Sequence, residues 1–201
     1  SFLVGANEDS HTAQSRLAPI LANDEHNPAL KELEEAFNIE RVTKEFFEEY
    51  RNLFLWVKEE LDRIVQAEAK IRRDFESKQV STVDFAKKLL GQIVFLYFLQ
   101  KKGWFGVTRD SQWGTGSRQF LRELFERKHS GYDNFFNDIL EPLFYVALCQ
   151  DRSYIDDYYD KLNCRIPFLN GGLFDPINGY DWVHTDIMLP DQVFSNKVIT
   201  K

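Results

Sequence analysis

The chain has 201 residues, of which 43% are hydrophobic and 15% aromatic, and these proportions can fill the core of a large folded domain. Charged residues make up 28% of the sequence, and no apolar run reaches the roughly 18 residues that a membrane-spanning helix needs, so we expect no membrane partner. The formal net charge of -7 excludes a uniformly basic surface of the kind that binds nucleic acid through phosphate counterion exchange.

The N-terminal residues Ser-Phe-Leu-Val-Gly-Ala lack a basic segment and a full apolar core, so they do not form a secretory signal, and we expect a cytoplasmic protein. Met188 is the sole methionine, so the chain is expected to be processed or cut from a longer polypeptide. The cysteines Cys149 and Cys164 fit buried free thiols better than a disulfide framework or a zinc site.

Three regions are expected along the chain. Residues 1–37 form a connector from a preceding module, with a short helix over residues 12–21 and a second helix that Asn27 caps and Pro28 begins. Residues 38–150 form a helical core domain, and residues 151–201 form an irregular segment.

Between residues 38 and 75, apolar residues recur every three or four positions, which predicts one long amphipathic helix. At about 1.5 Å per residue, an unbroken helix of this length spans roughly 55 Å. If the helix breaks, we expect the break between Glu59 and Asp62.

Ser81 is a hydroxyl cap for a helix that is predicted to end near Lys102, before Gly103. Its residues 93–99, Ile-Val-Phe-Leu-Tyr-Phe-Leu, are apolar on every face, which predicts a helix buried on all sides at the centre of the core. A loop follows at residues 104–117, with the Gly-Thr-Gly sequence 114–116 as a flexible tip.

Two more helices are expected, over residues 117–128 and 132–149, and Pro142 kinks or divides the second. Beyond Asp151 the pattern becomes irregular, with a small hairpin around Asn178-Gly179. The sequence therefore predicts a mainly α-helical fold. We expect an irregular multi-helix bundle with one long amphipathic helix, one fully buried central helix and a short irregular or β-containing C-terminal segment.

Residues 167–176, Pro-Phe-Leu-Asn-Gly-Gly-Leu-Phe-Asp-Pro, are the most distinctive stretch. Gly171 and Gly172 permit a positive φ and the close approach of another segment. Apolar residues on either side supply anchors to a core. We predict a tight turn pinned into that core, and we assign a structural role to the motif Asn170, Gly171, Gly172, Leu173 and Phe174.

Matches to catalytic signatures are weak. Asp62, Glu68 and Lys70 imitate the acid and lysine residues of a metal-dependent nuclease, but Glu68 and Lys70 would face different sides of one helix. The four histidines are scattered, with no partner at metal-ligand spacing. The sequence thus predicts no catalytic, cofactor-binding or metal-binding residue in this chain.

Contact with a DNA backbone would have to come from local basic patches, although a single patch is more often a solvated helix face. Our candidates are Lys101, Lys102, Arg118 and Arg122.

Four segments, in this order, resemble the region between the nuclease and methyltransferase modules of Type IIG restriction–modification enzymes and related adenine-specific DNA methyltransferases. The segments are residues 16–21 (RLAPIL), 36–47 (AFNIERVTKEFF), 95–104 (FLYFLQKKGW) and 168–174 (FLNGGLF). The resemblance implies flanking nuclease and methyltransferase modules that act on DNA, with S-adenosylmethionine and Mg as cofactors of the parent protein and a flipped adenine as target.

This chain lacks the Asn-Pro-Pro-aromatic tetrad, the glycine-containing cofactor turn and the nuclease residues of that family. We therefore expect a helical connector and scaffold that is inactive alone and ends before the methyltransferase core, with DNA-backbone contact as a secondary role. The alternative hypothesis is a helical protein-interaction domain with no role in DNA.

Overall fold

Helices dominate the fold, as the sequence predicts. The computed structural model describes residues 18, 20, 22, 27–36, 39–169 and 171–195. The chain divides into two units, residues 1–51 and residues 52–201. The predicted helix over residues 12–21 lies largely outside the described residues.

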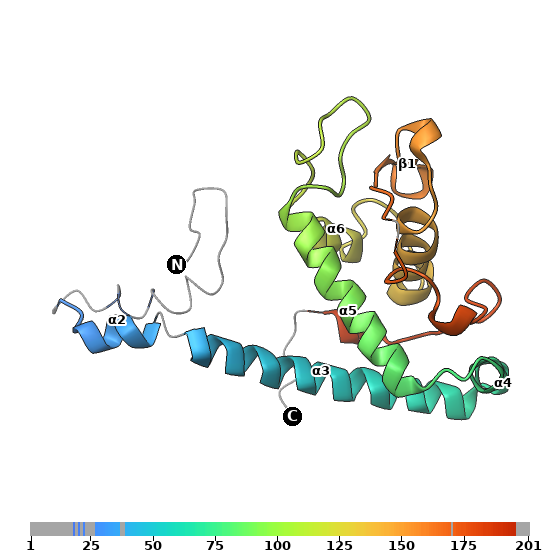
Figure 1. Cartoon of the computed structure of the whole chain (residues 1–201), viewed down its shortest axis with the longest axis horizontal. Helices are drawn as coiled ribbons and strands as arrows, with labels where there is room; N and C mark the ends of the chain where they lie inside the picture. Colours follow the sequence, from blue (N-terminus) through green and yellow to red (C-terminus); the bar gives the residue numbers. More distant parts are fainter. Residues whose placement is uncertain are drawn as a thin grey trace. The chain divides into compact units, whose positions relative to one another are not determined.

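The first unit contains α2 (Leu30–Ala36) and the start of α3 (Ile39–Ala67) (Figure 1). The backbone N–H of Ala29 donates to Glu32 Oε2 at 2.9 Å, and this return contact of a capping box fixes the start of α2. The prediction that Asn27 caps this helix is therefore wrong by two residues.

The predicted long amphipathic helix is confirmed as α3, but it ends before residue 75. Glu68 leaves the helical region, with φ -100° and ψ 100°, and α4 (Ala69–Ser77) follows. Arg72 Nη1 donates to Gln66 O at 3.0 Å and so satisfies a carbonyl next to the break. The break expected between residues 59 and 62 is thus displaced toward the C-terminus.

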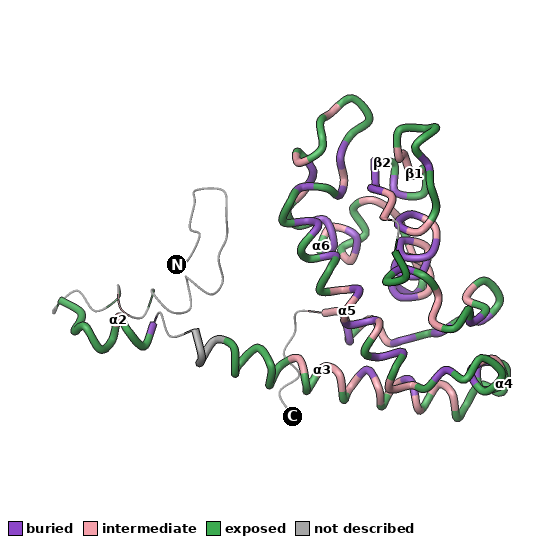
Figure 2. The backbone as a smooth tube through the Cα atoms, viewed as in Figure 1, coloured by how far each residue is buried: buried purple, intermediate pink, exposed green. Residues whose placement is uncertain are grey.

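The helix predicted after Ser81 is α5 (Thr82–Lys101), and Ser81 Oγ accepts from the N–H of Asp84 at 3.0 Å, as expected of a cap. Gly103 follows the helix with φ +69°. The expectation that α5 is buried on all sides is wrong, because buried and exposed residues alternate along the helix (Figure 2). The exposed apolar side chains are Val94, Phe95, Tyr97 and Phe98.

The loop after α5 is held at its base. Gly103 O accepts from the N–H groups of Gly114 (3.1 Å) and Gly116 (2.9 Å), and Gly116 is buried. The Gly-Thr-Gly sequence is therefore a packed closure of the loop and no flexible tip. Helix α6 (Phe120–Phe125) lies beside the C-terminal half of α5 in Figure 1, and Leu121 N donates to Gln100 Oε1 at 3.1 Å.

Helix α6 is shorter than the predicted helix over residues 117–128. It ends because Arg127 takes a positive φ of 61°, and the N–H of Lys128 bonds to Glu123 O at 2.9 Å. The next predicted helix is present as two π-helical segments, η1 (Phe136–Leu140) and η2 (Leu143–Leu148), with Glu141 and Pro142 between them.

The predicted β-containing C-terminal segment is confirmed, but its strands lie earlier than the hairpin expected around Asn178-Gly179. Strands β1 (Tyr158–Tyr159) and β2 (Cys164–Arg165) pair antiparallel, and Arg165 N also donates to Val107 O at 2.8 Å. The hairpin expected around Asn178-Gly179 is absent, since these residues belong to the 3-10 turn η5 (Ile177–Gly179). Asn178 takes the positive φ of 49° that such a tight turn requires.

The remaining short 3-10 turns are η3 (Ser153–Ile155), η4 (Asp160–Leu162) and η6 (Asp191–Phe194). The core of the second unit is built around aromatic rings. The ring of Phe85 lies 5.5 Å from that of Phe75, 5.3 Å from that of Tyr180 and 6.1 Å from that of Phe136. Helices α4 and α5, segment η1 and the C-terminal segment therefore share one apolar centre.

Candidate functional site

The Gly-Gly block is held on α5 by two polar side chains that lie one helical turn apart. Lys88 Nζ donates to Gly172 O at 3.0 Å, and Gln92 Nε2 donates to Leu173 O at 2.9 Å. Phe174 is 2% exposed, and its ring lies 5.9 Å from that of Phe95 and 5.8 Å from that of Phe144. The predicted anchoring of this block in a core is therefore confirmed for Phe174.

The glycines act differently from the prediction. Neither Gly171 nor Gly172 has a positive φ, and a Cβ on Gly171 would meet no atom within 4 Å. Gly172 and Leu173 instead present their carbonyls to α5. Leu173 is 38% exposed, so it is no full anchor, and Asn170 lies outside the described residues.

Below the block, Cys149 Sγ donates to Asp175 Oδ1 at 3.0 Å. Burial raises the pKa of the Cys149 thiol to about 11, and the Asp175 carboxylate adds to the shift. Burial likewise raises the pKa of the Cys164 thiol to about 12. Both thiols stay protonated at neutral pH, and a protonated thiol is a poor nucleophile, so neither is set up for covalent catalysis.

A buried polar chain runs from α5 to the C-terminal segment. Tyr145 bonds to Gln92 and lies 3.0 Å, oxygen to oxygen, from Tyr180, whose hydroxyl also donates to Glu141 Oε1. Glu141 is 1% exposed, and its Oε2 is without a hydrogen-bond partner among the described residues. Burial raises the pKa of Glu141 well above its ordinary value, so the structure favours a neutral carboxyl.

The sequence analysis did not predict this series of buried polar side chains. Glu141 and Gln92 each interrupt an apolar helical run, and a lone polar residue in such a run is the signal that could have found them. The hydroxyl of a tyrosine carries no sequence mark of burial. The arrangement fixes α5, η2 and the segment around Tyr180 relative to one another through directional contacts.

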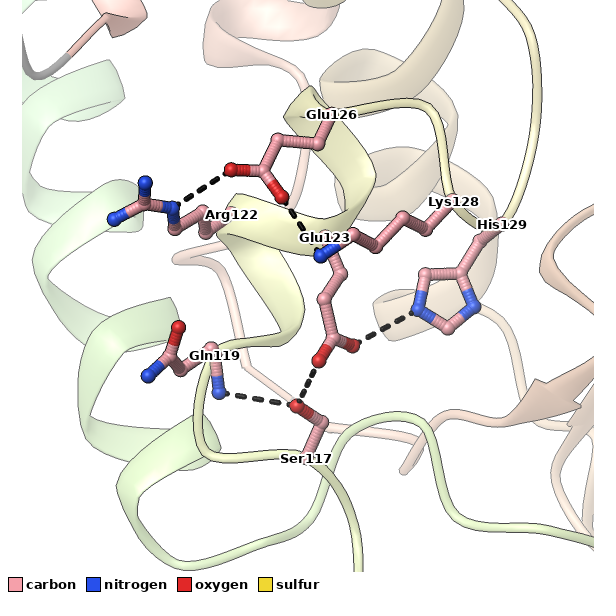
Figure 3. A network of polar contacts seen from close by, with 7 residues as sticks. All are labelled: Ser117, Gln119, Arg122, Glu123, Glu126, Lys128 and His129. Carbon is pink, nitrogen blue, oxygen red and sulfur yellow. Dashed lines mark hydrogen bonds and ion pairs between the residues drawn. The ribbon is translucent and has the colours of Figure 1, made fainter. Parts of the chain in front are cut away.

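The four DNA-backbone candidates lie at the ends of α5 and α6 or beside them. Lys101 ends α5 and Lys102 follows it, whereas Arg118 precedes α6 and Arg122 lies within α6. The Arg122 Nε atom donates to Glu126 Oε1 at 2.8 Å, and Lys128 Nζ lies 2.8 Å from Glu126 Oε2 (Figure 3). The positive charge of Arg122 is thus already balanced by the carboxylate of Glu126. Lys102 and Arg118 are exposed and form no ion pair within the described part of the chain.

The same network ties the start of α6 to the turn after it. Glu123 accepts from Ser117 Oγ at 2.7 Å and contacts His129 Nε2 at 3.1 Å, while the N–H of Gln119 donates to Ser117 Oγ (Figure 3). These contacts link the residues before a short helix to the residues after it. We interpret them as structural.

The residues that imitate a metal-dependent nuclease, Asp62, Glu68 and Lys70, do not form a common site. Asp62 accepts from Lys58 Nζ at 2.5 Å and from Thr82 Oγ1 at 2.6 Å. Glu68 lies at the helix break, on the wall of a cavity of about 430 Å³ that Asp186 and Met188 also line. Within the described residues, no group of three or more His, Cys, Asp or Glu side chains could hold a metal ion. No helix in the described part of the chain combines the length and apolar character that a membrane crossing requires.

Comparison with known proteins adds no relative to this picture. No family model matches the chain. No curated protein matches it, and no solved structure does.

Proposed function

We propose that this chain is a helical connector and scaffold of a DNA restriction–modification enzyme, whose methyl transfer and cleavage are carried out by flanking modules. The resemblance of four ordered segments motivates the proposal. It places S-adenosylmethionine and Mg in those flanking modules, and DNA as the substrate of the parent protein.

The contact between two of the resembling segments carries the proposal. Residues 95–104 lie largely on α5. Residues 172–174 of the other segment are held against the same helix by Lys88, Gln92 and the ring of Phe95. These segments are distant in sequence, yet they meet in one place. A connector needs such a fixed junction, because a rigid body between two modules sets the distance and orientation at which they act.

The isolated chain is expected to transfer no methyl group. The test incubates it with duplex DNA and labelled S-adenosylmethionine and measures label on the DNA. Methyl transfer by the chain alone would overturn the connector role. A second test is the reading frame that encodes the chain, in which we expect an Asn-Pro-Pro-aromatic motif downstream.

A helical protein-interaction domain is the second candidate, and the exposed apolar side of α5 favours it. Electrophoretic mobility shift on duplex DNA at low and moderate salt tests direct DNA contact. A shift that weakens with salt supports DNA contact and counts against a domain with no role in DNA. No shift at any protein concentration removes direct DNA contact but leaves the scaffold role.

A further inference from the structure

One straight stripe of residues runs along the solvent side of α5. Its members are spaced alternately by three and four positions, which is the heptad spacing that keeps residues on one line of a helix. They are Asp84, Lys87, Gly91, Val94, Phe98 and Lys101, and we call them the α5 stripe. Gly91 is half-buried and the other five are exposed.

The middle of the α5 stripe is apolar. Val94 is 49% exposed and Phe98 is 53% exposed, and Phe95 and Tyr97 extend the apolar surface to either side. Exposing large apolar side chains to water is energetically unfavourable, and a group of them on one helix face is typical of an interaction surface. The described residues of the second unit leave this face uncovered.

Gly91 is a second observation that points to a partner. It lies in the interior of a helix, where glycine is less favourable than alanine. Its φ is not positive, and a Cβ there would meet no atom within 4 Å. Within the described residues, the fold therefore gives no reason for glycine at this position. A second backbone that approaches closely would give one.

The two ends of the α5 stripe carry opposite charges, so the stripes of two copies of the chain can be complementary to each other. Asp84 lies at its N-terminal end and Lys101 at its C-terminal end. Asp84 accepts a hydrogen bond from Ser81 Oγ at 2.7 Å, and its ion pair with Lys87 is long, at 3.8 Å, and exposed. Lys101 forms no ion pair within the described part of the chain. In an antiparallel pair of stripes, Asp84 of each copy faces Lys101 of the other. A parallel pair would place like charges together at both ends, which is unfavourable.

The antiparallel register also suits the middle of the stripe. With Asp84 facing Lys101, Gly91 faces Val94, and Lys87 faces Phe98. The glycine makes room for valine, and the lysine stem packs on the aromatic ring with its ammonium over the face. Each of these contacts occurs twice about a twofold axis, as in an isologous dimer.

We propose that the α5 stripe is a homodimer interface, in which α5 of one copy packs antiparallel against α5 of a second copy. The dimer goes beyond the connector role and does not depend on it. Its test uses only the mass and cross-linking of the chain, so its failure leaves the methyl-transfer and DNA tests untouched.

Sedimentation equilibrium of the chain is expected to give the mass of a dimer that dissociates on dilution. Val94→Asp, on the exposed side of the helix, is expected to give a monomer with an unchanged circular dichroism spectrum. The matched control is Val183→Asp, because Val183 is also an exposed valine, 61% accessible and outside the α5 stripe. A monomer at every concentration of the unaltered chain overturns the proposal, and so does an equal effect of both variants.

Charge exchange tests the register. Asp84→Lys and Lys101→Asp are each expected to raise the dimer dissociation constant by more than about tenfold, since each places like charges together. The double variant restores opposite charges and is expected to recover most of the affinity. Additive losses in the double variant overturn the antiparallel register.

A mixed disulfide tests the centre of the interface. A mixture of Gly91→Cys and Val94→Cys chains is expected to form the mixed cross-link faster than either variant cross-links to itself, with the unaltered chain as the control for Cys149 and Cys164. Faster self-cross-linking of each variant indicates a parallel pair and overturns the proposal.

Discussion

At the residue scale, Phe174 is the anchor of the Gly-Gly block. It is 2% exposed, between the rings of Phe95 and Phe144. Phe174→Ala is expected to lower the free energy of unfolding by about 3–5 kcal/mol, because it removes a buried ring and leaves a cavity. Urea unfolding followed by circular dichroism measures this loss.

The control is Leu173→Ala in the same block. Leu173 is 38% exposed, so its truncation is expected to cost less than about 1 kcal/mol. Equal losses in the two variants would contradict the assignment of the anchor to Phe174.

Glu141 makes the stability of the chain depend on pH. The pKa of Glu141 in the folded protein is raised by burial, whereas in an unfolded chain it lies near the ordinary glutamate pKa of 4.5. Above that value the unfolded chain binds fewer protons than the folded one, so the stability from the neutral carboxyl is fully present at lower pH and is lost as the pH rises toward the folded pKa. Glu141→Gln removes the titrating group and keeps an oxygen that accepts from Tyr180.

We expect the Gln variant to lose less stability than the unaltered chain between about pH 5 and about pH 8, as measured by urea unfolding at each pH. Tyr180→Phe serves as the comparison, because it keeps the carboxyl but removes its donor. The same pH dependence in the Gln variant as in the unaltered chain would contradict a buried neutral carboxyl.

The roles of some residues in this block could be predicted from the sequence, and the roles of others could not. The apolar anchor Phe174 followed from its pattern, since a large ring beside a turn needs a core. The roles of Gly171 and Gly172 did not, because a glycine permits positive φ without requiring it. Lys88 and Gln92 were missed because their carbonyl partners are about 80 positions away, at sequence separations of 84 and 81.

At the scale of elements, the loop after α5 depends on close backbone packing. A Cβ on Gly116 would lie 1.8 Å from Phe105 O, so the backbone itself has to move. Gly116→Ala is expected to destabilise the chain by about 3 kcal/mol or more, at the upper end of overpacking effects. Thermal and urea unfolding both measure the loss.

Gly131→Ala is the matched control, because a Cβ at Gly131 would meet no atom within 4 Å. Its effect is expected to stay within about 0.5 kcal/mol. A small loss of stability in Gly116→Ala would contradict the close packing of the loop. It would show that the loop opens at little cost, as expected of the flexible tip predicted from the sequence.

Element boundaries show why local patterns predict a helix better than its end. The break at Glu68 falls among good helix formers, with no glycine or proline to mark it, and is completed by Arg72 from the next helix. The exposed side of α5 was missed for a similar reason. An all-apolar run predicts burial, but it does not distinguish burial within the chain from burial against a partner.

At the scale of the whole molecule, the mainly helical class was predictable because long apolar periodicities determine it. A short irregular or β-containing C-terminal segment was also predicted. The residues that pair in the small sheet were not, since strands of two residues carry no period and β2 depends on the distant Val107 for a further bridge. The same limit applies to function. Lys102 follows α5 and Arg118 precedes α6, and only the packing of α6 beside α5 brings these two helices together.

Salt dependence of DNA binding tests the proposed contact at this scale. With a net charge of -7, the chain can bind DNA only through a local patch, and exposed lysine and arginine without ion pairs are the groups that release phosphate counterions. Lys102→Ala together with Arg118→Ala is expected to lower the slope of log affinity against log salt by about two, whereas Arg122→Ala changes it less because Glu126 already compensates Arg122. Fluorescence anisotropy with labelled duplex DNA across a salt series measures the slopes. Lys78→Ala, which removes an exposed charge from the end of α4, is the matched control. An equal change of slope with Lys78→Ala would show that only the net charge of the chain matters and would contradict a local binding patch.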